Sequence, residues 1–83
     1  MDPVSYNIAL NLSYEDLSNL AAVNKMFNRI YVNNYFWYAK YVKDYGKPDY
    51  VLVRNWKSYY QQRYKEEKVN YYMYINTLEP ELS

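Results

Sequence analysis

Apolar residues recur at helical spacing in the first half of the chain. Leu17, Leu20, Val23, Phe27 and Ile30 follow one another at steps of three, three, four and three residues. This is the period of one face of an α-helix, whereas a half-buried strand alternates every two residues. The pattern therefore predicts a helical stripe over this part of the chain.

Capping residues divide this stripe, and the segments around it, into separate helices. Pro3 suits a first helical turn, and Ser13 suits a helix N-cap. Asn24 and the Asn33-Asn34 pair interrupt the pattern, and asparagine favours caps over helix interiors. Gly46, the only glycine, stands where a C-terminal cap is expected, with a proline two residues later. The expected helices span about residues 3–11, 14–22, 24–32 and 35–45.

The second half of the chain predicts one further helix. Trp56, Tyr60 and Tyr64 lie at steps of four, and no glycine or proline interrupts residues 55–76. The preceding residues 50–53 form a short run rich in β-branched side chains. This run is compatible with an extended segment or with the first turn of the helix. The sequence thus predicts an all-α fold of about five helices. Within one compact domain, residues 1–45 form a helical module, residues 46–76 an aromatic helix extension and residues 77–83 a flexible tail.

The composition argues against catalysis and against a metal or cofactor site. The 83 residues include neither cysteine nor histidine, which removes thiolate ligands and the commonest metal ligand and general base. Ser13 consequently has no histidine to activate it. The adjacent acids Glu15-Asp16 and Glu66-Glu67 point apart on a helix and cannot share one substrate. We expect no enzyme activity, no cofactor and no metal.

Charge and aromatic content favour protein binding over other partners. The formal net charge is only +1, too small for the electrostatic footprint of a nucleic-acid binder. The 14 tyrosines exceed what so small a core can hide, and tyrosine suits binding surfaces because one end of the ring can stay wet. An AT-rich coding bias is a second explanation for their number. No signal peptide or membrane span is expected, which indicates the cytoplasm or the nucleus.

An ordered set of residues in the first half resembles the F-box. The Asp16-Leu17 pair opens the second helix, Val23-Asn24-Lys25 precedes an aromatic residue at Phe27, and Trp37 follows ten residues later. The F-box has an Asp-Leu pair, a "Leu-x-x-Val-Cys-Lys-x-Trp" core and a tryptophan at this distance. Asn24 replaces the common cysteine, Phe27 replaces the common tryptophan, and the usual Leu-Pro-x-Glu opening is absent. The resemblance covers residues 3–42.

The resemblance implies a three-helix module that docks a Skp-type adaptor, which links it to the cullin scaffold and RING subunit of a ubiquitin ligase. Three short helices cannot enclose every apolar residue of the stripe, so an outward-facing patch is expected. The expected adaptor-binding residues are Val4, Ile8, Leu12, Leu17, Leu20, Val23, Lys25, Phe27, Ile30 and Trp37.

The region after the module carries a second similarity. Residues 55–64 resemble the "Trp-Lys-x-x-Tyr-x-x-Arg-Tyr" helix that often follows an F-box. About 40 residues after the motif are too few for leucine-rich repeats or a propeller, so the last helix would recruit one substrate or the chain would only occupy the adaptor. The small size of the chain and its AT-rich coding bias suggest a virus or parasite that uses the ligase of a host cell. The candidate substrate or second-partner surface is Trp56, Tyr59, Tyr60, Arg63 and Tyr64.

Two alternatives stay open. Basic and aromatic residues alternate between Arg54 and Lys68, and such mixing can bind single-stranded nucleic acid, although the charge balance makes this the weaker hypothesis. The other alternative is a tyrosine-rich helical bundle that associates with itself.

Overall fold

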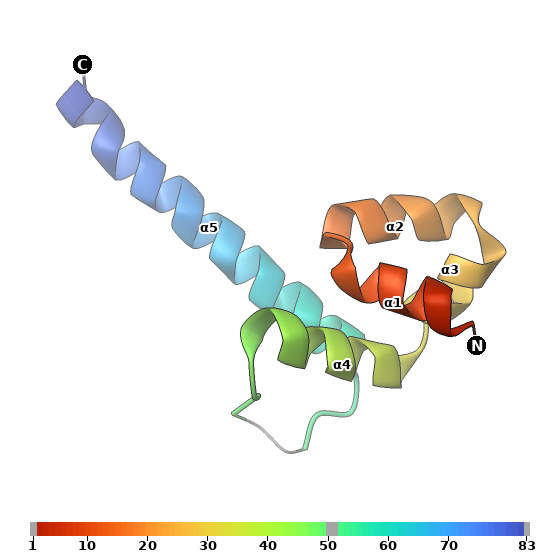
Figure 1. Cartoon of the computed structure of the whole chain (residues 1–83). Coiled ribbons are helices and arrows are strands. Elements are labelled where there is room, and N and C mark those ends of the chain that lie inside the picture. The colour runs from red at the N-terminus through yellow and green to blue at the C-terminus, as the bar shows by residue number, and fades with distance from the viewer. Residues whose placement is uncertain (1, 50–51, 83) are drawn as a thin grey trace.

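The chain folds into helices throughout the part that the structure describes. The computed structural model describes the backbone of residues 2–49 and 52–82, and side chains within these ranges as far as Tyr74. These residues contain five helices and no strand: α1 (Pro3–Asn11), α2 (Tyr14–Val23), α3 (Lys25–Tyr31), α4 (Asn34–Tyr45) and α5 (Trp56–Leu82) (Figure 1). The all-α fold of about five helices is confirmed.

Local sequence fixes where the first four helices begin. Each starts after an Asp, Ser or Asn whose side-chain oxygen accepts a hydrogen bond from a backbone N–H of the first turn. These N-caps are Asp2, Ser13, Asn24 and Asn33. A cap of this kind contributes about 1 kcal/mol. At the other end of α4, Gly46 has a φ of 84°, a left-handed conformation that favours glycine.

The last helix differs from its expected limits. α5 continues to Leu82, so residues 77–82 are helical where the sequence predicted a loose tail. Of the β-branched run before α5, Leu52 and Val53 lie in an irregular connection, while Tyr50 and Val51 lie outside the described residues.

The helices form a compact body from which half of one helix projects. α1, α2 and α3 pack together, and α4 lies against α1, α3 and the beginning of α5. The rest of α5 extends away from the body, with no other helix beside its C-terminal half (Figure 1). The described chain is correspondingly elongated, with extents of 51 × 32 × 17 Å.

The indole of Trp37 joins most of these elements. Its ring is fully buried and lies 5.0–6.0 Å, between centroids, from the rings of Tyr14, Tyr31, Phe36 and Tyr60. Its Nε1 donates a hydrogen bond of 2.5 Å to the carbonyl oxygen of Tyr31. Aromatic pairs of this kind add about 0.5–1.5 kcal/mol each to the burial of their surface. Trp37 therefore ties α2, α3 and α5 to α4.

A buried lysine on α4 holds the end of α1. Lys40 is 1% exposed, and its Nζ donates to the carbonyl oxygens of Leu10, at 3.2 Å, and Leu12, at 2.7 Å. A cation suits these free carbonyls because they carry the negative end of the helix dipole. Asp44 pairs with Lys40 at 3.2 Å and accepts a 2.5 Å hydrogen bond from the hydroxyl of Tyr60. Burial lowers the pKa of Lys40, and the pairing with Asp44 opposes that effect.

Replacing Lys40 tests this network. Lys40→Ala removes the hydrogen bonds to the Leu10 and Leu12 carbonyls and the ion pair with Asp44, so we expect the free energy of unfolding to fall by about 2–3 kcal/mol. Lys43→Ala is the matched control, because this neighbouring lysine is half exposed and lies 4.0 Å from the same carboxylate. The control should change stability by no more than about 0.5 kcal/mol. Urea denaturation followed by circular dichroism measures both, and equal effects would contradict the assignment.

Candidate protein-binding site

The expected adaptor-binding residues divide into buried and exposed groups. Leu17, Ile30 and Trp37 are 0% exposed and belong to the hydrophobic core. This corrects the expectation that these three contact a partner. Their periodicity arises because they face the interior of the protein's own bundle, and periodicity alone does not distinguish that role from docking.

Three further residues of the set are partly buried. Leu12 and Phe27 pack against the core from its edge, and Leu20 is also of intermediate exposure. These side chains support the shape of the surface and offer a partner only part of their area.

The remaining four residues are exposed. Val4 and Ile8 are 66% and 47% exposed on α1, and Val23 is 83% exposed at the end of α2. Lys25, at the start of α3, is exposed as well. Residues of α1 one position away, Ser5 and Ala9, are the buried ones, so Val4 and Ile8 lie on the outer side of this helix.

The exposed residues of α1 and α3 lie at the same end of the body. The Ser5 hydroxyl contacts the Met26 sulfur at 3.0 Å, which brings the first turns of α1 and α3 together. Met26 is itself 44% exposed and was not among the residues expected from the sequence. We call the surface made by Val4, Ile8, Val23, Lys25 and Met26 the α1–α3 face.

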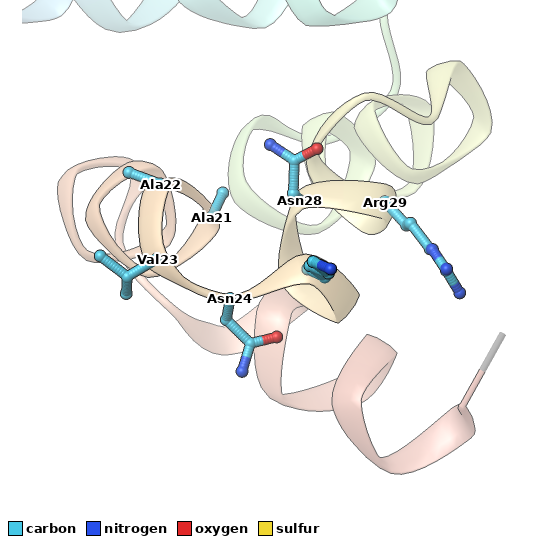
Figure 2. A pocket seen from close by; sticks show the side chains of 7 residues that line it. Ala21, Ala22, Val23, Asn24, Asn28 and Arg29 are labelled. Carbon is cyan, nitrogen blue, oxygen red and sulfur yellow. The ribbon is translucent and has the colours of Figure 1, made fainter.

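A depression lies at the elbow where α2 turns into α3. Its volume is about 450 Å³. Figure 2 shows Ala21, Ala22 and Val23 at the end of α2 on one side of it, and Asn28 and Arg29 of α3 on the other. The small alanine side chains leave this space open, so a partner side chain can enter at the edge of the α1–α3 face.

The elbow is electropositive. Lys25 and Arg29 both line it, one helical turn apart, and no carboxylate is among the lining residues. Neither cation forms an ion pair with the residues that the structure describes. Their charge therefore remains available to an acidic partner. Arg29 was not among the site residues expected from the sequence, although its spacing of four from Lys25 indicates a shared helix face.

The candidate second-partner surface on α5 packs against the body instead. Tyr60 is 3% exposed, and Trp56, Tyr59 and Tyr64 pack partly buried on the core. Arg63 lies over the ring of Tyr45, a residue of α4, at 5.2 Å, and pairs with Glu67. Packing on the body takes most of the four aromatic residues out of the possible second-partner surface, whereas Arg63 remains exposed. Their four-residue period arises because α4 covers one side of α5.

Side chains also tie the start of α2 to α5. The ring of Tyr14 lies 4.8 Å from that of Tyr64, and its hydroxyl accepts a hydrogen bond of 2.8 Å from Gln61. Glu15 accepts a 2.5 Å hydrogen bond from the Tyr64 hydroxyl and pairs with Lys68. The hydrogen bond from Lys68 and then that from Tyr64 lower the pKa of Glu15. We call Glu15, Tyr64 and Lys68 the α2–α5 clamp.

Other kinds of site lack support in the described residues. No group of carboxylates among them is placed to hold a metal ion, and none of the described helices is long and apolar enough to cross a membrane. No protein-family model, curated protein or solved structure matches the chain.

Acid should weaken the α2–α5 clamp. Because the folded protein lowers the pKa of Glu15, this carboxylate stabilises the fold above its unfolded pKa of about 4.5 and loses that effect as the pH falls through the folded value. We expect Glu15→Gln to show a smaller drop in melting temperature between pH 7 and pH 3 than the wild type. Thermal unfolding followed by circular dichroism measures the difference.

Asp16→Asn is the matched control for this experiment. Asp16 is the next acid along α2 and is also exposed, but its carboxylate forms no ion pair with the described side chains of α5. It should leave the pH dependence close to that of the wild type. The clamp has no role in acid sensitivity if Glu15→Gln and Asp16→Asn change it equally.

Proposed function

We propose that this chain is an F-box-type docking protein whose α1–α3 face binds a Skp-type adaptor. The observation that carries the proposal is the exposure of Val4, Ile8 and Val23 on a small helical module. All three lie at positions where the sequence resembles the adaptor-binding motif. The proposal therefore joins a family resemblance with a surface that is open to a partner.

The energetics of the α1–α3 face favour an occupant. Burial of an exposed valine, isoleucine or methionine is worth roughly 1.5–3 kcal/mol per side chain when complete. Scattered apolar residues are normal on a surface, whereas adjoining ones usually mark a protein contact. Val4 adjoins Ser5, whose hydroxyl contacts the sulfur of Met26 and so joins α1 to α3, and Ile8 follows Val4 by one helical turn. The side chains of Val4, Ile8 and Met26 supply an apolar centre for such a contact.

The elbow supplies a complementary polar edge. Lys25 and Arg29 lie beside the apolar residues without an ion pair among the described residues. Rim charges of one sign steer an oppositely charged partner and set its orientation more than they add to affinity. We expect the adaptor segment that reaches the elbow to be acidic.

The proposed role is binding without catalysis. The sequence contains no histidine or cysteine, so the common general base and the common thiol nucleophile are missing. The chain would recruit a substrate to a cullin–RING ubiquitin ligase, or interfere with that ligase by occupying its adaptor. Its place of action would be the cytoplasm or nucleus of the cell that supplies the adaptor.

Charge substitutions on α1 test adaptor docking. Val4→Asp places a carboxylate in the proposed apolar centre, so we expect adaptor affinity to fall at least about tenfold, equivalent to some 1.4 kcal/mol. Val32→Asp is the matched control, because Val32 is 65% exposed against 66% for Val4 and lies beyond the end of α3. Isothermal titration of a purified Skp-type adaptor into each variant gives the affinities. Ile8→Asp should repeat the effect of Val4→Asp.

The outcome is decisive in both directions. Micromolar or tighter binding that Val4→Asp weakens and Val32→Asp leaves intact supports the proposal. Absence of wild-type binding at micromolar concentration contradicts it, and so does equal weakening by the two aspartates. Leu17→Asp is unsuitable for this purpose, because a carboxylate at this fully buried position would unfold the module.

A further inference from the structure

The C-terminal half of α5 leaves apolar side chains exposed, and no other helix among the described residues lies beside it. Val69, Tyr71, Tyr72, Met73 and Tyr74 are between 56% and 63% exposed. In Figure 1 this part of α5, coloured blue, extends beyond the other helices. We call residues 69–82 the α5 arm. An isolated helix of this length is marginal in water without a packing partner.

The arm continues a face of α5 that is already used for packing. Tyr60 and Tyr64 lie one turn apart and are covered by the body. Tyr71 and Tyr74 follow at steps of seven and three, which keeps them on the same side of the helix. They are 62% and 63% exposed, because α2 and α4 end before the helix does. The same apolar face thus passes from covered to uncovered within one helix.

We propose that the α5 arm pairs with the arm of a second copy of this chain in an antiparallel homodimer. A tyrosine surface is complementary to itself, since each hydroxyl both donates and accepts and the rings pair edge to face. The sequence of residues 69–78 contains no charged residue, so two identical arms meet without like-charge repulsion. This proposal does not depend on adaptor docking, which uses the opposite end of the chain.

The antiparallel orientation follows from the position of the body. α2 contacts the face of α5 at Tyr60, Tyr64 and Lys68, immediately before the arm begins. In a parallel pair, both bodies would occupy the same side and the same level, where they would collide. An antiparallel pair places them at opposite ends of the joined arms and leaves Tyr71 and Tyr74 facing the partner.

The available area predicts a weak dimer. Val69 and Met73 lie on the other side of the helix, so the interface draws on the tyrosines. With roughly 200 Å² for an aromatic side chain, the exposed parts of Tyr71, Tyr72 and Tyr74 come to roughly 370 Å² per copy. A pair therefore buries at most about 740 Å² through these rings, the size of a weak, transient contact. Association should accordingly appear only at high micromolar concentration.

Sedimentation equilibrium of the full chain tests the dimer. The wild type should change from monomer to dimer with increasing concentration, and Tyr71→Lys/Tyr74→Lys should weaken association at least tenfold. Tyr35→Lys is the matched control, because Tyr35 is an even more exposed tyrosine, at 82%, on α4. Circular dichroism and the melting temperature show whether each variant keeps its body folded. A wild type that stays monomeric up to several hundred micromolar overturns the proposal, as does equal weakening by Tyr35→Lys.

A distance measurement tests the orientation. The chain has no cysteine, so Gln62→Cys carries the only thiol and accepts a single spin label at an exposed position. If the two arms overlap along their full length, an antiparallel pair separates the two labels by about 40 Å, from 1.5 Å of rise per residue. A parallel pair brings them within about 20 Å. Double electron–electron resonance distinguishes the two, and the shorter distance would overturn the antiparallel arrangement. Binding of the arm to a different protein by a wild-type chain that stays monomeric would also overturn it.

Discussion

The burial of one indole holds this small protein together. Trp37 is in contact with rings from α2, α3 and α5, and its Nε1 is satisfied by a carbonyl oxygen at the end of α3. A chain of 83 residues buries only about 60% of its unfolded surface, and this one has no disulfide to compensate. It therefore relies on large, interlocking aromatic side chains. The packing of helices around the Trp37 cluster determines which side chains are buried and therefore which remain exposed as candidate surfaces.

A buried charge completes the same arrangement. Lys40 reaches the free carbonyls of α1 while Asp44 links it to the hydroxyl of Tyr60. No buried side-chain nitrogen or oxygen among the described residues lacks a hydrogen-bond partner. Loss of one member of such a network leaves other buried polar groups unpaired, which costs free energy. The network therefore favours a single arrangement of α1, α4 and α5. With α1 fixed in this way, Val4 and Ile8 stay on the outside.

Much of the fold could be predicted from local sequence. Ser13 and Asn24 are the caps at which α2 and α3 begin, and Gly46 is the cap at which α4 ends, each where its own chemistry favours it. The role of Lys40 could not be predicted, because the carbonyl oxygens that it binds lie 28 and 30 residues away in sequence. A lysine on a helix is ordinarily solvated, and nothing in its neighbours indicates otherwise.

The candidate site was harder to predict than the fold. A helical stripe identifies apolar side chains on one helix face, but it does not show which are buried. Leu17 and Ile30 are buried in the core, whereas Val23 is exposed. The difference depends on how the helices pack, which is a property of tertiary structure. The tyrosines of α5 illustrate the same limit, since Tyr60 and Tyr74 share a sequence pattern and differ in exposure from 3% to 63%. Composition indicated that some tyrosines must be exposed, and only the packing identified which ones.

We proposed that the α1–α3 face docks an adaptor, whereas Leu17 and Ile30 of the stripe are buried in the core. Hydrogen–deuterium exchange of the chain, alone and saturated with a purified Skp-type adaptor, would distinguish these two groups of residues. We expect slower exchange in α1 and at the elbow between α2 and α3 when the adaptor is bound, and little change in α4. Slower exchange confined to α5, or none anywhere at saturating adaptor, would contradict the docking proposal.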